Sequence, residues 1–341
     1  MSVVRLAVTH CHGSGNDFPL IDARPLDGAA GASPAERWPA LPAGAWPVVA
    51  RALADRAGPV GGDGLLLLVP GDDAHDFGMA MYNSDGSESS QCLNGLRCVG
   101  RAGLAALGLE RARVRLVSSS AEVWAEPDLA PGVHTIGERA GPAGLDVARW
   151  PLTGAGAEGT GRILDAVVPP LDAHRRFTAI AMPNPHLVSF VDQVDEAELV
   201  RLGTICEGAP AWLPNRANVS FVEVRGPRTS PPTLYVRTFE RGVGLTDSCG
   251  SAMAASTIAA AMTGQVAWDA PVTVLNRGGR VRVTAGSDGH ATISGNATWE
   301  WAGEVDVDLA TGIASGLVVT QAYDDEVAAW AAAVGTPAAR S

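Results

Sequence analysis

The sequence predicts an α+β fold, because segments with strand patterns outnumber the helical segments. The chain of 341 residues is long enough for two ordinary domains and a substantial core. Hydrophobic residues make up 46% of it and charged residues 18%, which is typical of a folded globular protein. We therefore expect sheets packed against a few helices rather than a doubly wound sheet.

Five segments have the pattern of strands, either apolar throughout or with apolar and polar residues in alternation. In chain order they are residues 64–70 (GLLLLVP), 114–119, 122–126, 233–239 and 279–285. The first is the most apolar run of the chain and is far too short to cross a bilayer, so it is predicted to be a buried strand.

Helical segments are fewer, and long Gly- and Pro-rich stretches lie between the elements. The helices are expected at roughly residues 35–57, 96–107, 196–202, 251–263 and 324–334. The last belongs to an appended segment that we interpret as a surface helix covering an edge. Residues 126–151 and 152–173 are rich in Gly, Pro and Ala, and the first stretch is where we expect a domain boundary.

Charge and composition argue against several classes of protein. The formal net charge of −12 works against binding to nucleic acid. The first residues contain no apolar run of the length of a signal peptide, so we expect a soluble, cytoplasmic protein without a membrane partner. No GxGxxG follows a strand, and GTGRI at 159–163 is interpreted as a loop, so nucleotide binding has no support.

All 25 basic residues are arginine. Pyridoxal phosphate enzymes hold their cofactor as a Schiff base on a lysine, and a P-loop also needs one. Both kinds of site are therefore excluded, and we expect no cofactor.

The five cysteines are odd in number and widely scattered, which favours free thiols over a disulfide framework. Cys98 and Cys206 are interpreted as small buried hydrophobic residues. Cys11 stands between two histidines, but no second cluster at metal-ligand spacing accompanies it, so we expect no metal site. Cys92 and Cys98 are six residues apart and do not form a CxxC redox pair.

The other two cysteines stand in similar surroundings. Cys92, in NSDGSESSQCLNGLRC, and Cys249, in GVGLTDSCGSAMAAS, each follow a turn-rich loop and open a segment predicted to be helical. They are 157 positions apart (249 − 92). The sequence therefore repeats one device, a thiol at the start of a helix, once in each half.

The first turn of a helix carries unpaired N–H groups and the positive end of the helix dipole. A thiol at this place has a lowered pKa and can act as a base, and a carboxylate can bind the same N–H groups. Two such sites facing each other would hold one carboxylate with a thiol on either side of the adjacent carbon. This arrangement suits removal of a proton from one face of an α-carbon and its return to the other.

Six motifs in order resemble those of the diaminopimelate epimerase family, whose members invert one α-carbon of LL-diaminopimelate without a cofactor. The resemblance covers roughly residues 5–307, with HGSGNDF (12–18), GPVGGDGLLLL (58–68), YNSDGSESSQCLNGLRC (82–98), NPH (184–186), RANVSFVEV (216–224) and ERGVGLTDSCGS (240–251). It implies two pseudo-symmetric halves, each a sheet wrapped around a central helix, with the active site in the cleft between them. A homodimer is consistent with it.

We accordingly divide the chain into four segments. They are an N-terminal half carrying Cys92 (1–132), a C-terminal half carrying Cys249 (133–294), a strand returning to the N-terminal half (295–307) and a C-terminal extension (308–341).

The resemblance also implies residue roles. Cys92 and Cys249 would be the acid/base thiols, with His186 and Glu240 near them to tune their protonation. The carboxylate at the reacting centre would bind the backbone at Leu93, Asn94, Gly250 and Ser251. The distal end of the amino-acid substrate would be read by Asn83, Asn218 and Arg241, with Asn16 and Asn184 also lining the site. A planar guanidinium independently suits a second carboxylate at Arg241.

Four positions depart from the family pattern, which usually has Gly at Leu93, Gln at Gly64, Glu at Leu245 and Gly at Ala252. These departures leave open a racemase or epimerase that acts on another amino acid. A catalytically inactive binding module of the same fold is a further alternative, against which the retention of both thiols argues.

Overall fold

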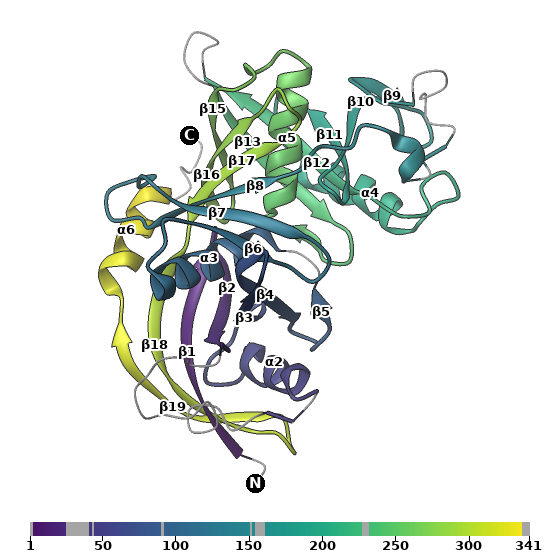
Figure 1. Cartoon of the computed structure of the whole chain (residues 1–341). Helices are drawn as coiled ribbons and strands as arrows, with labels where there is room; N and C mark the ends of the chain where they lie inside the picture. The colour runs from purple at the N-terminus through teal and green to yellow at the C-terminus, as the bar shows by residue number, and fades with distance from the viewer. Residues whose placement is uncertain are drawn as a thin grey trace. The chain divides into compact units, whose positions relative to one another are not determined.

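The computed structural model describes residues 3–24, 41–42, 44–89, 92–150, 152–153, 161–226 and 232–335 (Figure 1). The chain folds into two compact units, one made of Met1–Glu138 and Gly295–Ser341 and the other of Arg139–Ser294. The boundaries between these units fall after Glu138 and between residues 294 and 295. The division of the chain into four segments stays a prediction.

The first unit contains most of the long strands. They are β1 (Val3–Gly13), β2 (Asn16–Asp22), β3 (Gly64–Asp72), β4 (His75–Asn83), β5 (Glu88–Ser89), β6 (Arg111–Arg115), β7 (Ser120–Glu126), β18 (Thr298–Asp308) and β19 (Ile313–Ala322). Its helices are α2 (Trp46–Ala54), α3 (Leu93–Leu107) and α6 (Asp324–Val334). The division between the units runs through β8 (Thr135–Ala140) and β17 (Ala291–Asn296).

The second unit has a similar set of elements. Its strands are β9 (Ala166–Val168), β10 (Asp172–Ala181), β11 (Pro185–Phe190), β12 (Asn218–Arg225), β13 (Thr233–Glu240), β14 (Gly244–Thr246), β15 (Pro271–Asn276) and β16 (Gly279–Ala285). Its helices are α4 (Glu196–Glu207), α5 (Gly250–Met262) and a 3₁₀ turn at Val147–Arg149.

The two units repeat one topology. In the first, β1 pairs antiparallel with β2, β2 parallel with β3, β3 antiparallel with β4, β4 parallel with β6, and β6 antiparallel with β7. In the second, β10, β11, β12, β13, β15 and β16 follow the same order of antiparallel and parallel pairs. The short hairpin partners β5 and β14 also correspond. The expected pseudo-symmetric α+β fold is confirmed.

In each unit a central helix lies against the sheet that wraps around it (Figure 1). α3 packs against β1, β2, β3, β4, β6 and β7, and α5 packs against the six corresponding strands. Small residues allow this close approach: a Cβ on Gly103 of α3 would lie 2.5 Å from the ring of Phe77. In α5, residues 252–261 are all buried, and most of them are alanine.

Several predicted boundaries are close to those observed. The helix expected at 324–334 and the strand expected at 279–285 coincide with α6 and β16, while α3 and α5 begin at Leu93 and Gly250 rather than at 96 and 251. The helix expected at 35–57 is α2, whose bounds are Trp46–Ala54; residues 35–40 and 43 lie outside the described residues.

One predicted strand is wrong, and other strands were not predicted. Residues 114–119 are not one strand, because Leu116 donates its N–H to the Ser119 carbonyl in the turn that joins β6 to β7. The stretches 126–151 and 152–173, where no helix or strand was predicted beyond residue 126, contain β8, β9 and the start of β10. β8 pairs with the preceding strand β7, and β9 with the following strand β10, and Gly- and Pro-rich composition does not reveal this pairing.

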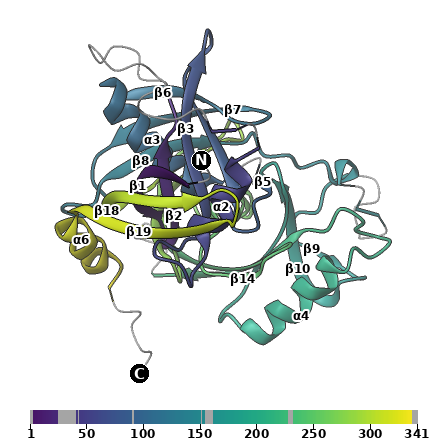
Figure 2. The same cartoon turned by 90° about the horizontal axis from the view of Figure 1, so that it is seen from below.

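The extension after residue 307 adds an outer strand and a helix to the first unit. β19 pairs antiparallel with the end strand β18, and the two run side by side in both views (Figures 1 and 2). α6 packs against β18, and Trp330 is its buried residue. The interpretation of residues 324–334 as a helix covering the surface therefore agrees with the structure.

Candidate active site

Cys92 is the N-cap residue of α3. Its backbone is extended (φ −147°, ψ 109°), and its sulfur accepts a hydrogen bond from the Gly95 N–H at 3.3 Å. The sulfur also lies 3.8 Å from Oδ1 of Asn16, at the start of β2. The first backbone hydrogen bond of the helix runs from Leu96 N to Cys92 O, so the amides of Leu93 and Asn94 precede the internal bonding of the helix.

Cys249 caps α5 with nearly the same backbone conformation (φ −136°, ψ 109°). Its sulfur lies 3.4 Å from the Ser251 hydroxyl. The carboxyl of Glu240, at the end of β13, lies beside the thiol: burial raises its pKa, and the hydrogen bond with Cys249 and the charge of Arg241 oppose the rise. Cys249 therefore has a hydroxyl and a carboxyl as neighbours, whereas Cys92 has the side-chain amide of Asn16.

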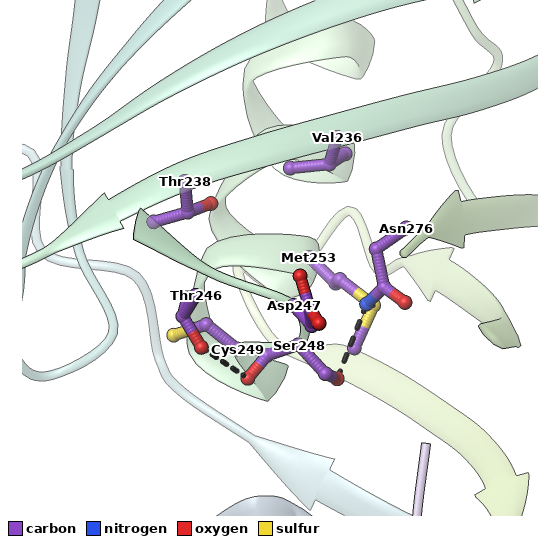
Figure 3. A pocket seen from close by; sticks show the side chains of 8 residues that line it. All are labelled: Val236, Thr238, Thr246, Asp247, Ser248, Cys249, Met253 and Asn276. Atoms are coloured by element: carbon purple, nitrogen blue, oxygen red, sulfur yellow. Dashed lines mark hydrogen bonds between the residues drawn. The ribbon is translucent and has the colours of Figure 1, made fainter. Parts of the chain in front are cut away.

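The loop that leads into Cys249 is held by its own polar contacts (Figure 3). Thr246 donates its hydroxyl hydrogen to the Ser248 carbonyl at 3.3 Å, and Asn276 on β15 donates to the Ser248 hydroxyl at 3.1 Å. Arg237, fully buried on β13, donates to the Thr246 carbonyl at 2.8 Å. These contacts fix the point at which the thiol enters the helix.

His186 is fully buried on β11, where its Nε2 lies 3.2 Å from Oδ1 of Asn184. Because that oxygen can only accept, Nε2 carries the hydrogen. Burial is the main cause that lowers the pKa of His186 to about 3, and the positive charge of Arg241 contributes to the same shift. The ring is therefore neutral near pH 7. Within the described ranges its Nδ1 has no hydrogen-bond partner.

Arg241 and Asn218 are also brought together. The backbone N–H of Arg241 donates to Oδ1 of Asn218 at 3.0 Å, and its guanidinium donates to the Asn215 carbonyl at 3.1 Å. No carboxylate forms an ion pair with Arg241 in the part of the chain that the structure describes. Arg216 does have one, with Glu207 at 2.8 Å.

A cavity of about 560 Å³ within the second unit is lined in part by Arg241 and Arg216. Burial lowers the pKa of Arg241, and the charge of Arg216 lowers it further. Trp150 and Arg149 also line this cavity, whose only acidic lining residue among those the structure describes is Asp146. The cavity therefore suits an anionic group.

The remaining predicted residues lie at the edges of elements. Asn83 ends β4 and donates to the Ser87 hydroxyl at 2.9 Å, and Leu93 is buried as the first residue of α3. Gly64 is packed against β4, where a Cβ would lie 2.3 Å from the Tyr82 carbonyl oxygen. The space beside Gly64 is thus filled by backbone of β4.

Strand register makes Asn16 and Asn184 equivalent in the two units. Leu20 pairs with Leu66, two residues after the start of β3, and Val188 pairs with Ser220, two residues after the start of β12. Asn16 and Asn184 each stand four residues before those paired positions of β2 and β11. The repeat thus places an asparagine, as well as a cysteine, at matching points of each unit.

Sequence reasoning missed Arg97, which is fully buried in α3 and donates to Oδ1 of Asn94 at 2.8 Å and to Glu138 at 2.8 Å. It also missed Asp63, which accepts a hydrogen bond from Nδ2 of Asn16. The available signal was a charged side chain within the otherwise small and apolar segment that follows Cys92.

The described residues contain no group of three or more His, Cys, Asp or Glu that could hold a metal ion. In the same residues, no helix is long and apolar enough to span a membrane.

Comparison with known proteins identifies the family. A profile described as "Diaminopimelate epimerase" matches residues 178–300, which include Cys249. The diaminopimelate epimerase of Listeria innocua is 35% identical over 319 residues, which cover 89% of each chain. That of Clostridium acetobutylicum is 34% identical over 317 residues, or 90% of this chain and 87% of that one. The chain belongs to the diaminopimelate epimerase family.

Solved structures agree with the epimerase fold. A phenazine biosynthesis protein of the PhzF family from Bacillus anthracis has a TM-score of 0.59 at 15% identity and covers 89% of this chain and 99% of its own. A hydroxyproline epimerase from Agrobacterium vitis has a TM-score of 0.58 at 15% identity, with 98% and 99% covered. At this identity the likeness concerns the fold alone.

Proposed function

We propose that the chain is an isomerase that interconverts LL- and meso-diaminopimelate by inverting one α-carbon, a step toward lysine and peptidoglycan precursors. One structural observation carries the proposal: Cys92 and Cys249 cap the central helices of two copies of one unit with the same extended backbone. Membership of the diaminopimelate epimerase family, at 35% identity over 89% of each chain, supports the substrate.

In the proposed reaction one cysteine acts as a thiolate and takes the α-proton, while the other delivers a proton to the opposite face. The first-turn amides of α3 and α5 bind the substrate carboxylate, where positive partial charge stabilises the developing enolate. The backbone of Leu93 and Asn94 supplies one set of donors and that of Gly250 and Ser251 the other. Glu240, hydrogen-bonded to Cys249, can take up or return the proton of that thiol.

The distal amino-acid end is assigned to Arg241, Asn218 and Asn83, with Asn16 and Asn184 lining the site. A half-buried guanidinium that donates to a carbonyl can form a two-pronged pair with a second carboxylate. Nδ2 of Asn218, buried and without a partner among the described residues, supplies a further donor. Neutral His186 contributes packing and a lone pair at Nδ1 rather than a charge.

An alternative within the same fold is a racemase or epimerase of another amino acid, favoured by Leu93, Gly64 and Leu245. The retention of Arg241, Asn83 and Asn218 favours the substrate with two acidic ends. An inactive binding module is the weaker alternative, because both thiols are retained.

The proposal also covers the location, partners and cofactor of the enzyme. We propose a cytoplasmic homodimer that binds neither nucleic acid nor membranes and needs no cofactor. The division into an N-terminal half with Cys92 and a C-terminal half with Cys249 belongs to it as well.

The deciding experiment is incubation of the purified chain with LL-diaminopimelate in D₂O, followed by NMR. Deuterium should enter the α-position, and the meso form should accumulate. Proline, hydroxyproline and glutamate serve as competing substrates. If one of them is turned over as fast as diaminopimelate, the substrate assignment is wrong; if none of the substrates exchanges its α-proton, the chain is not an epimerase.

A further inference from the structure

A chain of side-chain amides connects a buried arginine to the Cys92 thiol. Nη2 of Arg97 donates to Oδ1 of Asn94 at 2.8 Å, and Nδ2 of Asn94 donates to Oδ1 of Asn16 at 3.4 Å. The Cys92 sulfur lies 3.8 Å from that same oxygen of Asn16. All four residues belong to the first unit.

The two ends of this hydrogen-bonded chain, Arg97 and Asp63, determine how the amides of Asn94 and Asn16 are oriented. A guanidinium has only donors, so Arg97 requires the oxygen of Asn94 and leaves its NH₂ group for Asn16. At the other end a carboxylate only accepts, and Asp63 takes the hydrogen bond from Nδ2 of Asn16. Both ends therefore require Asn16 to turn its oxygen, and not its NH₂ group, toward the sulfur of Cys92.

We propose that Arg97 and Asp63 are positioning residues: from opposite ends they fix the side-chain amides of Asn94 and Asn16, so that Cys92 meets a hydrogen-bond acceptor. An acceptor favours the protonated thiol, whereas the Gly95 N–H on the same sulfur favours the thiolate. A change in either contact should therefore shift the protonation of Cys92. This inference rests on the proposed function, in which Cys92 is an acid/base group.

Arg97 is held firmly enough for this role. Its guanidinium also donates to Glu138 at 2.8 Å, to the Asn296 carbonyl at 3.2 Å and to the Ser14 hydroxyl at 3.1 Å. Every one of these acceptors lies in the first unit, and Arg97 and Glu138 are both fully buried. A side chain with so many fixed contacts cannot rotate away from Asn94 at little cost.

The charged groups around the amide chain are mostly paired. The pairs are Arg97 with Glu138, Arg56 with both Asp17 and Asp63, and His10 with Glu300. Burial lowers the pKa of His12 on β1, so it is neutral near pH 7.

Helix α5 of the second unit has no arginine at the position that corresponds to Arg97. Arg97 stands five residues after Cys92, and the residue five after Cys249 is Ala254, which is fully buried. The neighbours of Cys249 are the Ser251 hydroxyl and the Glu240 carboxyl instead. The two thiols are thus tuned by different chemistry.

The test is the rate of iodoacetamide alkylation of Cys92 against pH, resolved by peptide mass spectrometry on the intact chain. Arg97→Lys keeps the charge but cannot hold Asn94 together with its other partners. We expect the midpoint for Cys92 to fall by about half to one pH unit, the size of one hydrogen bond. The Cys249 peptide in the same sample is the internal reference.

Arg101→Lys is the matched control, because Arg101 also lies on α3 and pairs with Glu326, away from the amides. It should leave the Cys92 midpoint unchanged. Equal midpoints in folded Arg97→Lys and Arg101→Lys proteins would overturn the inference and leave Arg97 a purely structural role.

A second variant changes the other end of the amide chain, at the exposed side chain of Asp63. Asp63→Asn lets Asn16 turn its NH₂ group toward sulfur, so the midpoint should again fall. Asp17→Asn removes the same charge from Arg56 without touching Asn16, and should shift the midpoint much less. Equal shifts in these two variants would overturn the inference even if Arg97→Lys did not fold.

The turnover number for LL-diaminopimelate should fall about tenfold in Arg97→Lys. Alkylation needs no turnover, so the two proposals can fail separately. If the Cys92 midpoints shift but the chain does not epimerise diaminopimelate, the proposed function is rejected and the positioning role is retained. If the chain epimerises diaminopimelate but the midpoints do not shift, the positioning role is rejected and the function is retained.

Discussion

His186 lies directly opposite Asn218 on the parallel strands β11 and β12, and both side chains are fully buried. Nδ1 of the histidine and Nδ2 of the asparagine each lack a hydrogen-bond partner among the described residues. One of these atoms accepts and the other donates. An imidazole in this position resists protonation, and this has a measurable consequence.

The stability of the fold should depend on pH through His186. Its pKa is about 3 in the folded chain, against an ordinary value of 6.5, so between these values the unfolded chain binds the extra proton. The free energy of unfolding therefore falls as pH drops below about 6.5, by up to about 1.4 kcal/mol per pH unit. Urea unfolding at several pH values should show a flatter dependence in His186→Asn.

His174→Asn is the control for that series, because His174 is exposed. The carboxyl of Glu138 acts in the opposite sense, since burial raises its pKa to about 7, but it is common to all three proteins. Equal slopes in wild type and His186→Asn would contradict the neutral buried histidine.

Both capping thiols should be essential. Cys92→Ala and Cys249→Ala should each lower the turnover number by a factor of about 10² to 10⁴, because a thiol that transfers the proton is lost. Cys206→Ala should leave turnover nearly intact: Cys206 is fully buried in α4, and burial raises its pKa to about 12. Wild-type turnover in either capping variant would refute the two-base assignment.

Arg241 should matter only for substrates with a second carboxylate. Arg241→Ala should cost about 2–4 kcal/mol in transition-state binding of LL-diaminopimelate, and Arg241→Lys should not rescue it, because an ammonium cannot form the two-pronged pair. The measurement is kcat/KM for diaminopimelate and for a monocarboxylic amino acid, whose difference should shrink in the variants. Arg225→Ala, whose partners are Glu223 and Tyr235, is the control.

Restoring a side chain at Gly64 should be unfavourable. A Cβ there would lie 2.3 Å from the Tyr82 carbonyl oxygen, so Gly64→Ala should lower the free energy of unfolding by about 1–3 kcal/mol. Gly208→Ala, at the end of α4, is the control, because its nearest atom lies at 3.4 Å. If Gly64→Gln were as stable as wild type, β4 would move more easily than its packing indicates.

Activity should require no added cofactor, should survive chelators and should be lost on thiol alkylation or oxidation. The check is turnover after dialysis against EDTA, compared with turnover after iodoacetamide. Loss with EDTA that a divalent metal restores would show that the enzyme depends on a metal ion.

The sequence predicted the features that depend on local pattern. Alternation in residues 279–285 and the helical segment at 324–334 gave the bounds of β16 and α6. The two thiols were predicted as helix caps because a turn-rich loop before a run of small residues is a local signal. β8 and β9 were missed because their Gly- and Pro-rich surroundings obscure the strand pattern, although each pairs with a neighbouring strand, β8 with β7 and β9 with β10.

The candidate site shows the same limit. Cys92 and Cys249 could be predicted from their surroundings. The local pattern marks Arg97 only as a charged residue in a small and apolar segment, because its contacts with Glu138 and Asn296 come from the fold. Asp63 was missed for the same reason: it precedes an apolar strand, and only the fold brings it to Asn16.

The repeated topology has a consequence for how such an enzyme can vary. In a symmetric pair of identical half-length chains, any change near one thiol would be copied at the other, and both faces of a substrate would meet the same chemistry. Because both copies lie on one polypeptide, Arg97 in α3 and Ala254 in α5 can be substituted independently of each other. The two sides of a chiral centre can therefore be adjusted one at a time, by single substitutions.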